Sequence, residues 1–98
     1  MEQPKGYWVI QCQEITDSSA MQKYAEAWIE IANEYGAKFV AGGKQTSTVE
    51  GPNKPRVLVV EFRSYQVALD CYYSEKYQKA KEFAQKAMER TFSIVEGV

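Results

Sequence analysis

The stretch RVLVVEF, residues 56–62, runs without a polar break from an arginine to a glutamate. A strand with one face in water alternates apolar and polar residues, because successive side chains point to opposite faces of the sheet. Residues 57–60 are all branched aliphatics and do not alternate. The stretch therefore predicts a strand that is buried on both faces, and other parts of the structure have to pack against each of these faces.

Two segments before this strand also have strand character. Residues 7–13, YWVIQCQ, are rich in aromatic and branched side chains and place Trp8 and Cys12 on one face. Residues 37–51 predict a strand that is interrupted at the glycine pair 42–43, because paired glycines inside a strand mark a bulge or a sharp bend. The pair also permits close approach by another backbone or a ligand.

Three segments have apolar residues at helical spacing. Each begins beside a short polar side chain that can accept a hydrogen bond from an unpaired backbone N–H of the first turn. These caps are Asp17 or Ser18, Ser64 and Ser74. The predicted helices cover residues 16–36, 65–73 and 75–91. After them, a last apolar segment, residues 92–98, predicts a fourth strand.

The resulting order of elements is β-α-β-β-α-β, with the two short helices forming the second helical unit. This order is typical of the ferredoxin-like α+β fold, in which four antiparallel strands form one sheet and the helices cover one of its faces. A length of 98 residues fits one domain, residues 1–98.

The helices cover only one face of the RVLVVEF strand. The other face keeps apolar residues from this strand and from the first and last strands, and monomeric proteins rarely expose so large an apolar patch. Symmetric pairing is the commonest solution. The sequence therefore predicts a homodimer, with the sheets of two copies packed back to back.

Composition excludes several classes of function. The net charge is −1 without a basic stripe, so the chain is not expected to bind nucleic acid. No segment is long and apolar enough for a membrane span, and the first residues lack a signal region, which predicts a cytoplasmic protein without membrane contact.

The chain contains no histidine, which removes histidine-based nucleophile arrangements and the usual zinc and haem sites. We therefore expect neither a metal nor a tightly held cofactor. The two cysteines, Cys12 and Cys71, have no metal-type spacing and are expected to be reduced, half-buried thiols.

An ordered set of short segments resembles a known family. The segments are KGYWV, YGAKFVAGG, VEG, PRVLVVEFRS, YYSEKYQKAK and IVEGV, and together they span residues 5–98. The set is similar to the uncharacterised family catalogued as domain of unknown function thirteen-thirty. The resemblance implies a dimeric α/β barrel, in whose superfamily ligands usually sit between the helices and the sheet of each subunit. Cys71 and Glu75 depart from the family's usual tryptophan and proline.

Glu61 is the first candidate site residue. A carboxylate at the end of a doubly covered strand can be desolvated, which would raise its pKa toward use in acid–base catalysis. The alternative is a structural ion pair. A hairpin turning through residues 51–55 would place Lys44 and Gln45 opposite Glu61.

Arg56 is the second candidate. Its guanidinium can hold the carboxylate of a ligand through two parallel hydrogen bonds. The same hairpin would place Glu50 opposite it, and a surface pair of this kind is the alternative. Arg56 and Glu61 are an odd number of residues apart, so the two side chains should face opposite sides of the sheet.

The third group of candidates is aromatic. Large rings can line an apolar pocket while tyrosine hydroxyls orient a ligand, although a small domain also uses rings to fill its core and a dimer seam. For a ligand pocket we select Trp8, Tyr24 and Tyr72 from the six rings Trp8, Tyr24, Trp28, Tyr72, Tyr73 and Tyr77.

These residues leave three functions open. The first is a cofactor-independent enzyme that acts on a small apolar or aromatic metabolite between helices and sheet, with Glu61 as the acid–base group and Tyr24 or Tyr72 as the orienting donor. The second is a non-catalytic ligand-binding or stress-related homodimer with the same pocket. The third is a structural interaction protein without a pocket. The absence of a recognisable nucleophile or metal set counts against the enzyme.

Overall fold

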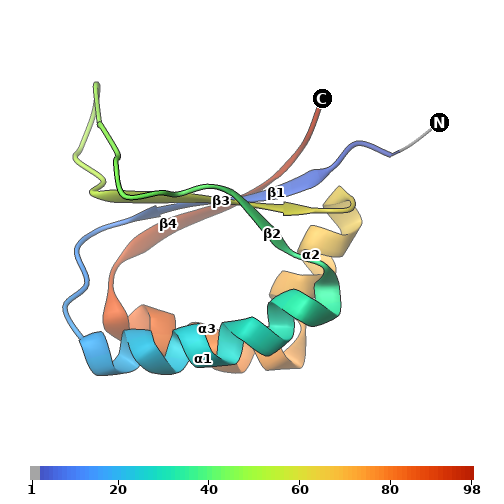
Figure 1. Ribbon diagram of the computed structural model, residues 1–98, viewed down its shortest axis with the longest axis horizontal. Coiled ribbons are helices and arrows are strands. Elements are labelled where there is room, and N and C mark those ends of the chain that lie inside the picture. Colours follow the sequence, from blue (N-terminus) through green and yellow to red (C-terminus); the bar gives the residue numbers. More distant parts are fainter. Residues whose placement is uncertain (1–2) are drawn as a thin grey trace.

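The computed structural model describes residues 3–98 and contains four strands and three helices (Figure 1). The second and third helices begin at the predicted residues, and the first begins at Ser18, directly after its predicted cap Asp17. The last helix ends at Ala87 rather than at residue 91, and the last strand begins at Arg90. The chain leaves the helix there because residues 90–96 pair with the first strand. In chain order the elements are β1 (Gly6–Cys12), α1 (Ser18–Tyr35), β2 (Lys38–Ala41), β3 (Arg56–Phe62), α2 (Tyr65–Tyr73), α3 (Glu75–Ala87) and β4 (Arg90–Glu96).

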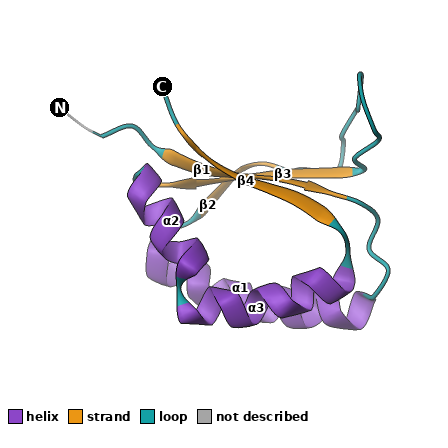
Figure 2. Cartoon of the chain, turned by 180° about the vertical axis from the view of Figure 1, so that it is seen from behind, coloured by secondary structure: helices purple, strands orange, loops and turns teal. Residues whose placement is uncertain are grey.

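The strands form one antiparallel sheet in the order β2-β3-β1-β4. All three helices lie on the same side of this sheet, and the other side has no helical cover (Figures 1 and 2). This confirms the predicted ferredoxin-like α+β fold. Alternate residues of β3 therefore have different surroundings. Val60 and Phe62 are buried beneath the helices, whereas Val57, Val59 and Glu61 belong to the bare face and remain partly exposed.

The core is built around the ring of Trp8, in the central strand β1. This side chain has no exposed surface, and its Nε1 donates a 3.0 Å hydrogen bond to the carbonyl oxygen of Ala68 in α2. Three rings from β3, α3 and β4 lie within 4.9 Å of it, centroid to centroid: those of Phe62, Tyr77 and Phe92. The indole thus joins the sheet to the helical layer, with its one polar atom satisfied.

The second strand is much shorter than predicted, because β2 ends at Ala41, before the glycine pair. Gly42 has a φ of 127°, a conformation that L side chains rarely adopt, and a Cβ there would lie 2.5 Å from Cδ2 of Leu58. The chain then leaves the sheet as a long loop, residues 42–55, which projects away from the helices (Figure 1). Gly42 confirms both predictions for the glycine pair: the chain bends there, and the backbone comes close to the neighbouring strand β3.

This early end of β2 overturns the predicted cross-strand pairs. The partner of Glu61 on β2 is Lys38, not Lys44 or Gln45, and Glu50 lies in the loop rather than opposite Arg56. The prediction was wrong because it assumed a continuous hairpin through residues 51–55, whereas the strand pairing stops at Ala41.

The predicted helix caps are present. Asp17 Oδ1 accepts from Ala20 N at 3.0 Å, and Ser64 Oγ accepts from Val67 N at 3.2 Å. Ser74 serves two helices at once. Its Oγ accepts from Tyr77 N at 3.2 Å at the start of α3 and donates to the carbonyl oxygen of Cys71 at 2.7 Å at the end of α2.

Replacing Ser74 by alanine should therefore remove two hydrogen bonds from one junction. We expect Ser74→Ala to lower the free energy of unfolding by about 1–2 kcal/mol, which urea denaturation will measure. Ser47→Ala, in the exposed loop, is the matched control and should change it little. Equal values for the two variants would show that the junction does not depend on this hydroxyl.

Both cysteines are free thiols, but the prediction that they are half-buried is wrong. Cys12 and Cys71 have no exposed surface. Burial, with a smaller contribution from Glu34, raises the pKa of the Cys71 thiol from 9.0 to about 12. At neutral pH this thiol is therefore protonated and acts as a small apolar core group.

The raised pKa of Cys71 predicts a pH dependence of stability. Between pH 9 and about pH 12 the unfolded chain loses this proton while the folded chain keeps it, so the contribution of Cys71 is complete below pH 9 and falls as the pH rises. The stability advantage of wild type over Cys71→Ala should shrink by at most about 1.4 kcal/mol per pH unit in this window. Denaturation of both proteins from about pH 8 to about pH 10.5 will measure it, and a constant difference would contradict the shift.

Candidate ligand-binding site

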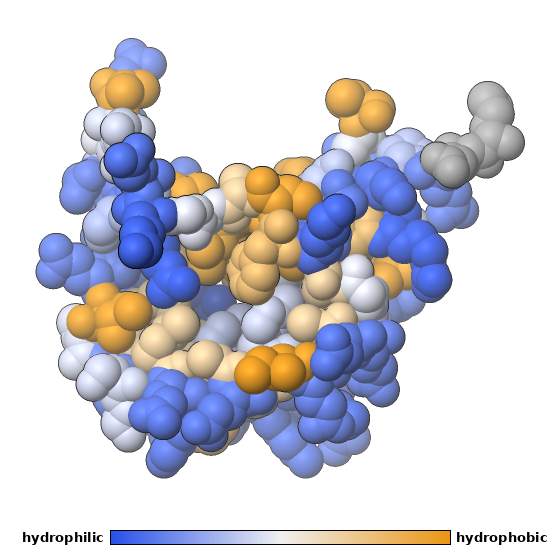
Figure 3. Space-filling view, in the orientation of Figure 1, coloured by the Kyte–Doolittle hydropathy of each residue, from blue (hydrophilic) through white to orange (hydrophobic). Residues whose placement is uncertain are grey.

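A cavity of about 300 Å³ lies between α1 and the sheet. In Figure 3 apolar surface surrounds a hollow between α1 and the sheet, while hydrophilic residues form much of the outer surface. Residues from all four strands and from α1 line the cavity. Most of the lining is aromatic or aliphatic, and includes Trp8, Ile10, Met21, Trp28, Phe39, Leu58 and Val60.

The apolar end of the cavity is formed by aromatic rings in tilted and edge-on contact. Trp28 lies 5.3 Å from Trp8 and 6.3 Å from Phe39, centroid to centroid. Phe39 is 55% exposed and Ile29 is 65% exposed, although both side chains are large and apolar. They stand at the mouth of the cavity, where a ligand that covered them would gain free energy from the apolar surface removed from water.

The other end of the cavity is polar. Cys12 pairs with Arg56 of β3 on one side and with Arg90 of β4 on the other, and all three residues line the cavity. Tyr24 completes this end. Its hydroxyl shares a 2.9 Å hydrogen bond with the hydroxyl of Tyr77, which has no exposed surface.

Arg90 is held in place by aromatic groups. Its Nη2 donates a 3.0 Å hydrogen bond to Tyr77 Oη, and its Cζ lies 5.3 Å from the ring centroid of Tyr24 and 5.0 Å from that of Phe92. Burial raises the pKa of Tyr77, so this hydroxyl stays neutral beside the guanidinium. The arrangement combines a charged hydrogen bond with two cation–π contacts.

Three of the predicted site residues meet in this cavity, namely Trp8, Tyr24 and Arg56. Sequence reasoning misses Arg90, because the predicted last helix, residues 75–91, includes it. The signal that could have found it is the two-residue spacing of Arg90, Phe92 and Ile94, which is typical of one face of a strand and extends the predicted strand toward Arg90.

The other two predicted residues lie elsewhere. Tyr72, in α2, does not line the cavity and packs its ring on Tyr77 and Phe92, at 5.4 and 5.0 Å between centroids. Glu61 is on the bare face of the sheet, where its Oε2 accepts a 3.2 Å hydrogen bond from Tyr7 Oη. It therefore cannot reach a ligand between the helices and the sheet of its own chain.

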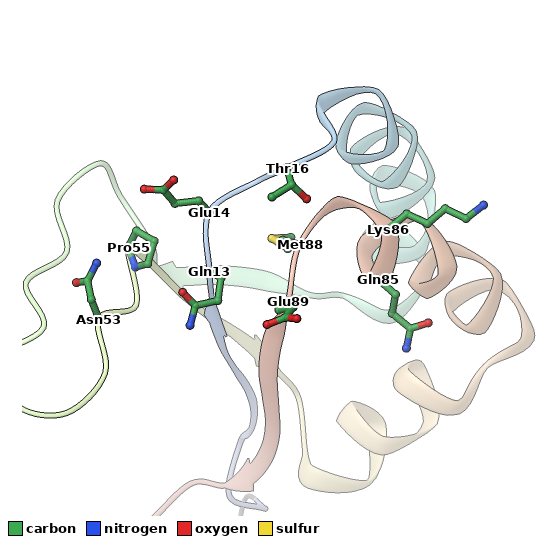
Figure 4. A pocket seen from close by; sticks show the side chains of 9 residues that line it. All are labelled: Gln13, Glu14, Thr16, Asn53, Pro55, Gln85, Lys86, Met88 and Glu89. Carbon is green, nitrogen blue, oxygen red and sulfur yellow. The ribbon is translucent and has the colours of Figure 1, made fainter.

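A second hollow, of about 560 Å³, is open and polar. It is lined by the loop after β1, the loop before β3 and the end of α3 (Figure 4). Its side chains do not converge: Lys86 and Gln85 project away from Glu14 and Gln13. The hollow lacks the enclosed apolar lining that is common to small-molecule sites, so the cavity under α1 is the better candidate.

Other kinds of site find no support in the part of the chain that the structure describes. Residues 3–98 contain no cluster of three or more cysteine, aspartate or glutamate side chains suited to a metal ion. No helix within the same range has the length and apolar character needed to cross a membrane.

The fold and the cavity define a ferredoxin-like α+β protein with an apolar pocket between sheet and helices. The chain belongs to the family described as Domain of unknown function (DUF1330), whose model matches residues 5–98. The resemblance read from the sequence is thereby confirmed. No curated protein matches the chain.

Solved structures of low sequence identity share the fold. A protein of unknown function from Rhodopseudomonas palustris is 14% identical with a TM-score of 0.77, over 99% of this chain and 85% of that one. A dimeric protein of unknown function and ferredoxin-like fold from Bacteroides fragilis is 14% identical with a TM-score of 0.59, over 98% and 99%. Hydroxynitrile lyase from Passiflora edulis is 13% identical with a TM-score of 0.58, over 95% and 93%. At such identities the likeness shows the fold alone.

Proposed function

We propose that this protein binds a small, largely apolar molecule in the cavity between α1 and the sheet. The observation that carries the proposal is a pocket with aromatic walls, exposed apolar side chains at its mouth and a polar group at one end only. A volume of about 300 Å³ lies at the small end of the range for ligand sites, and corresponds to a ligand on the order of ten non-hydrogen atoms.

Binding is better supported than catalysis. Acid–base catalysis at neutral pH needs a group whose pKa lies near the working pH, and the cavity lining contains no carboxylate. Burial raises the pKa of the Cys12 thiol, against the opposing effect of Arg90 and Arg56, so it stays protonated. One structural neighbour is a lyase, but its fold alone transfers no reaction. A catalytic function for Glu61 stays a prediction for the bare face of the sheet.

The two tryptophans provide a direct test, because both line the cavity and the chain has no others. We expect intrinsic fluorescence to respond to a panel of aromatic and aliphatic compounds of about ten non-hydrogen atoms. A ligand at one hundred times its Kd should stabilise the protein by about 2.7 kcal/mol.

Ala25→Phe should block this binding, because Ala25 lines the cavity from an exposed position on α1. Glu26→Phe adds the same ring one residue away, outside the lining, and should bind as wild type does. Unchanged binding in Ala25→Phe would place the ligand elsewhere and overturn the proposal.

The proposed assembly is a homodimer that packs sheet to sheet. The bare face carries valines from three strands, among them Val9, Val59 and Val95, and no helix covers them (Figure 2). A second copy would remove this apolar surface from water. The dimeric protein from Bacteroides fragilis shows that a chain of this fold can associate.

Light scattering after size exclusion will test the dimer. Wild type should have twice the chain mass of 11.2 kDa. Val59→Glu places a charge on the bare face and should give a monomer, since an unpaired charge is costly to bury. The same change at Val49, 87% exposed in the loop, should leave the dimer intact. A monomeric wild type at micromolar concentration would exclude this assembly.

A further inference from the structure

We infer that the ligand of this cavity is an amphipathic acid, whose single carboxylate is held between Arg56 and Arg90 while its apolar part lies against Trp8 and Trp28. The inference rests on the proposed function, that the cavity under α1 binds a small molecule, and it names the chemical class of that molecule.

The sheet places the two arginines in one row. Cys12 is the register partner of both Arg56 and Arg90, and all three side chains point to the helical face. Neighbouring strands lie about 4.8 Å apart, so the Cα atoms of the arginines are separated by about 10 Å. The side chain between them is small. Two long side chains can therefore converge on one anion above Cys12 without steric conflict.

Within residues 3–98 the two arginines have no counter-ion at ion-pair distance. Among residues 3–98, every ion pair within 4.0 Å involves Lys76 or Lys79 on the outer surface of α3, and none involves Arg56 or Arg90. The thiol between them is neutral, because burial raises the pKa of Cys12. Two partly buried positive charges thus share one end of an apolar cavity, and a bound anion would offset the cost of their desolvation.

Arg90 is also oriented in advance. One of its five N–H donors is committed to Tyr77 Oη, and the rings of Tyr24 and Phe92 fix the plane of the guanidinium. A donor that is already ordered loses less entropy when a ligand binds. The Tyr24 hydroxyl, which bonds to Tyr77, lines the same end of the cavity.

The rest of the lining favours a carboxylate over a larger anion. Apart from the row of Arg56, Cys12 and Arg90, the walls are almost entirely apolar. A carboxylate needs few donors and matches the planar guanidinium fork. A phosphate group carries more charge and more acceptor oxygens, which this lining would leave without partners. An aromatic or short aliphatic monocarboxylic acid fits both the polar end and the volume.

Isothermal titration with 3-phenylpropanoate and 3-phenylpropan-1-ol will test the inference, because the two differ only in the head group. We expect the acid to bind wild type at least about 10-fold more tightly than the alcohol, as is usual for hydrogen bonds to charged groups. Arg56→Gln and Arg90→Gln should each weaken the acid by about 10-fold and leave the alcohol nearly unchanged. Arg63→Gln, at an exposed arginine outside the cavity, is the control and should change neither.

The outcomes separate the inference from the function on which it rests. Equal affinity for acid and alcohol, both blocked by Ala25→Phe, would overturn the carboxylate and keep the binding site. No binding of either compound, nor of any in the panel, would overturn the proposed function itself. Tighter binding of 2-phenylethylphosphonate, which has the same apolar part, than of 3-phenylpropanoate would overturn the head-group assignment. Arg56→Gln keeps the test valid if Arg90→Gln does not fold, because Arg56 makes no hydrogen bond through its side chain within residues 3–98.

Discussion

The burial of one indole side chain determines much of this structure. Trp8 lies in a central strand and is fully buried. Its indole N–H, the one polar group of the side chain, donates a hydrogen bond to a carbonyl oxygen of α2. A ring of this size contributes a large share of the apolar area that a small domain can bury. The rings within 6.2 Å of its centroid come from all three helices and both neighbouring strands: Trp28, Phe62, Tyr72, Tyr77 and Phe92. Each layer of the molecule is therefore held to the others through contact with a single side chain.

The same ring also explains where the cavity lies. Trp8 packs against rings of α2 and α3, and on the side toward α1 its ring contact is with Trp28, whose ring plane is tilted by 41°. The cavity lies beside these two rings, and the small side chains of Cys12 and Ala25 are part of its lining. Packed cores leave few voids because empty space forfeits contacts. The ligand proposed above would restore the contacts that the lining of this open cavity lacks.

The sequence could predict the fold because local signals agree with one another. The alternation around Trp8, the caps at Asp17, Ser64 and Ser74, and the unbroken run in β3 all point to the same topology. The site was only partly predictable, since it depends on register between distant strands. The pattern of Arg90, Phe92 and Ile94 can place Arg90 on a strand, but only the register between β4 and β1 places it beside Cys12. The end of β2 depends likewise on another strand, because a Cβ at Gly42 would clash with Leu58 of β3.

The stretch RVLVVEF accounts for two surfaces at once, because its alternate residues belong to different faces. Arg56, Leu58 and Val60 line the cavity, while Val57, Val59 and Glu61 lie on the bare side. The proposed dimer would cover Val57 and Val59 without reaching Arg56, because alternate side chains of the strand point to opposite faces. The two proposals, association and ligand binding, therefore use separate surfaces of one strand, and loss of either one should leave the other intact.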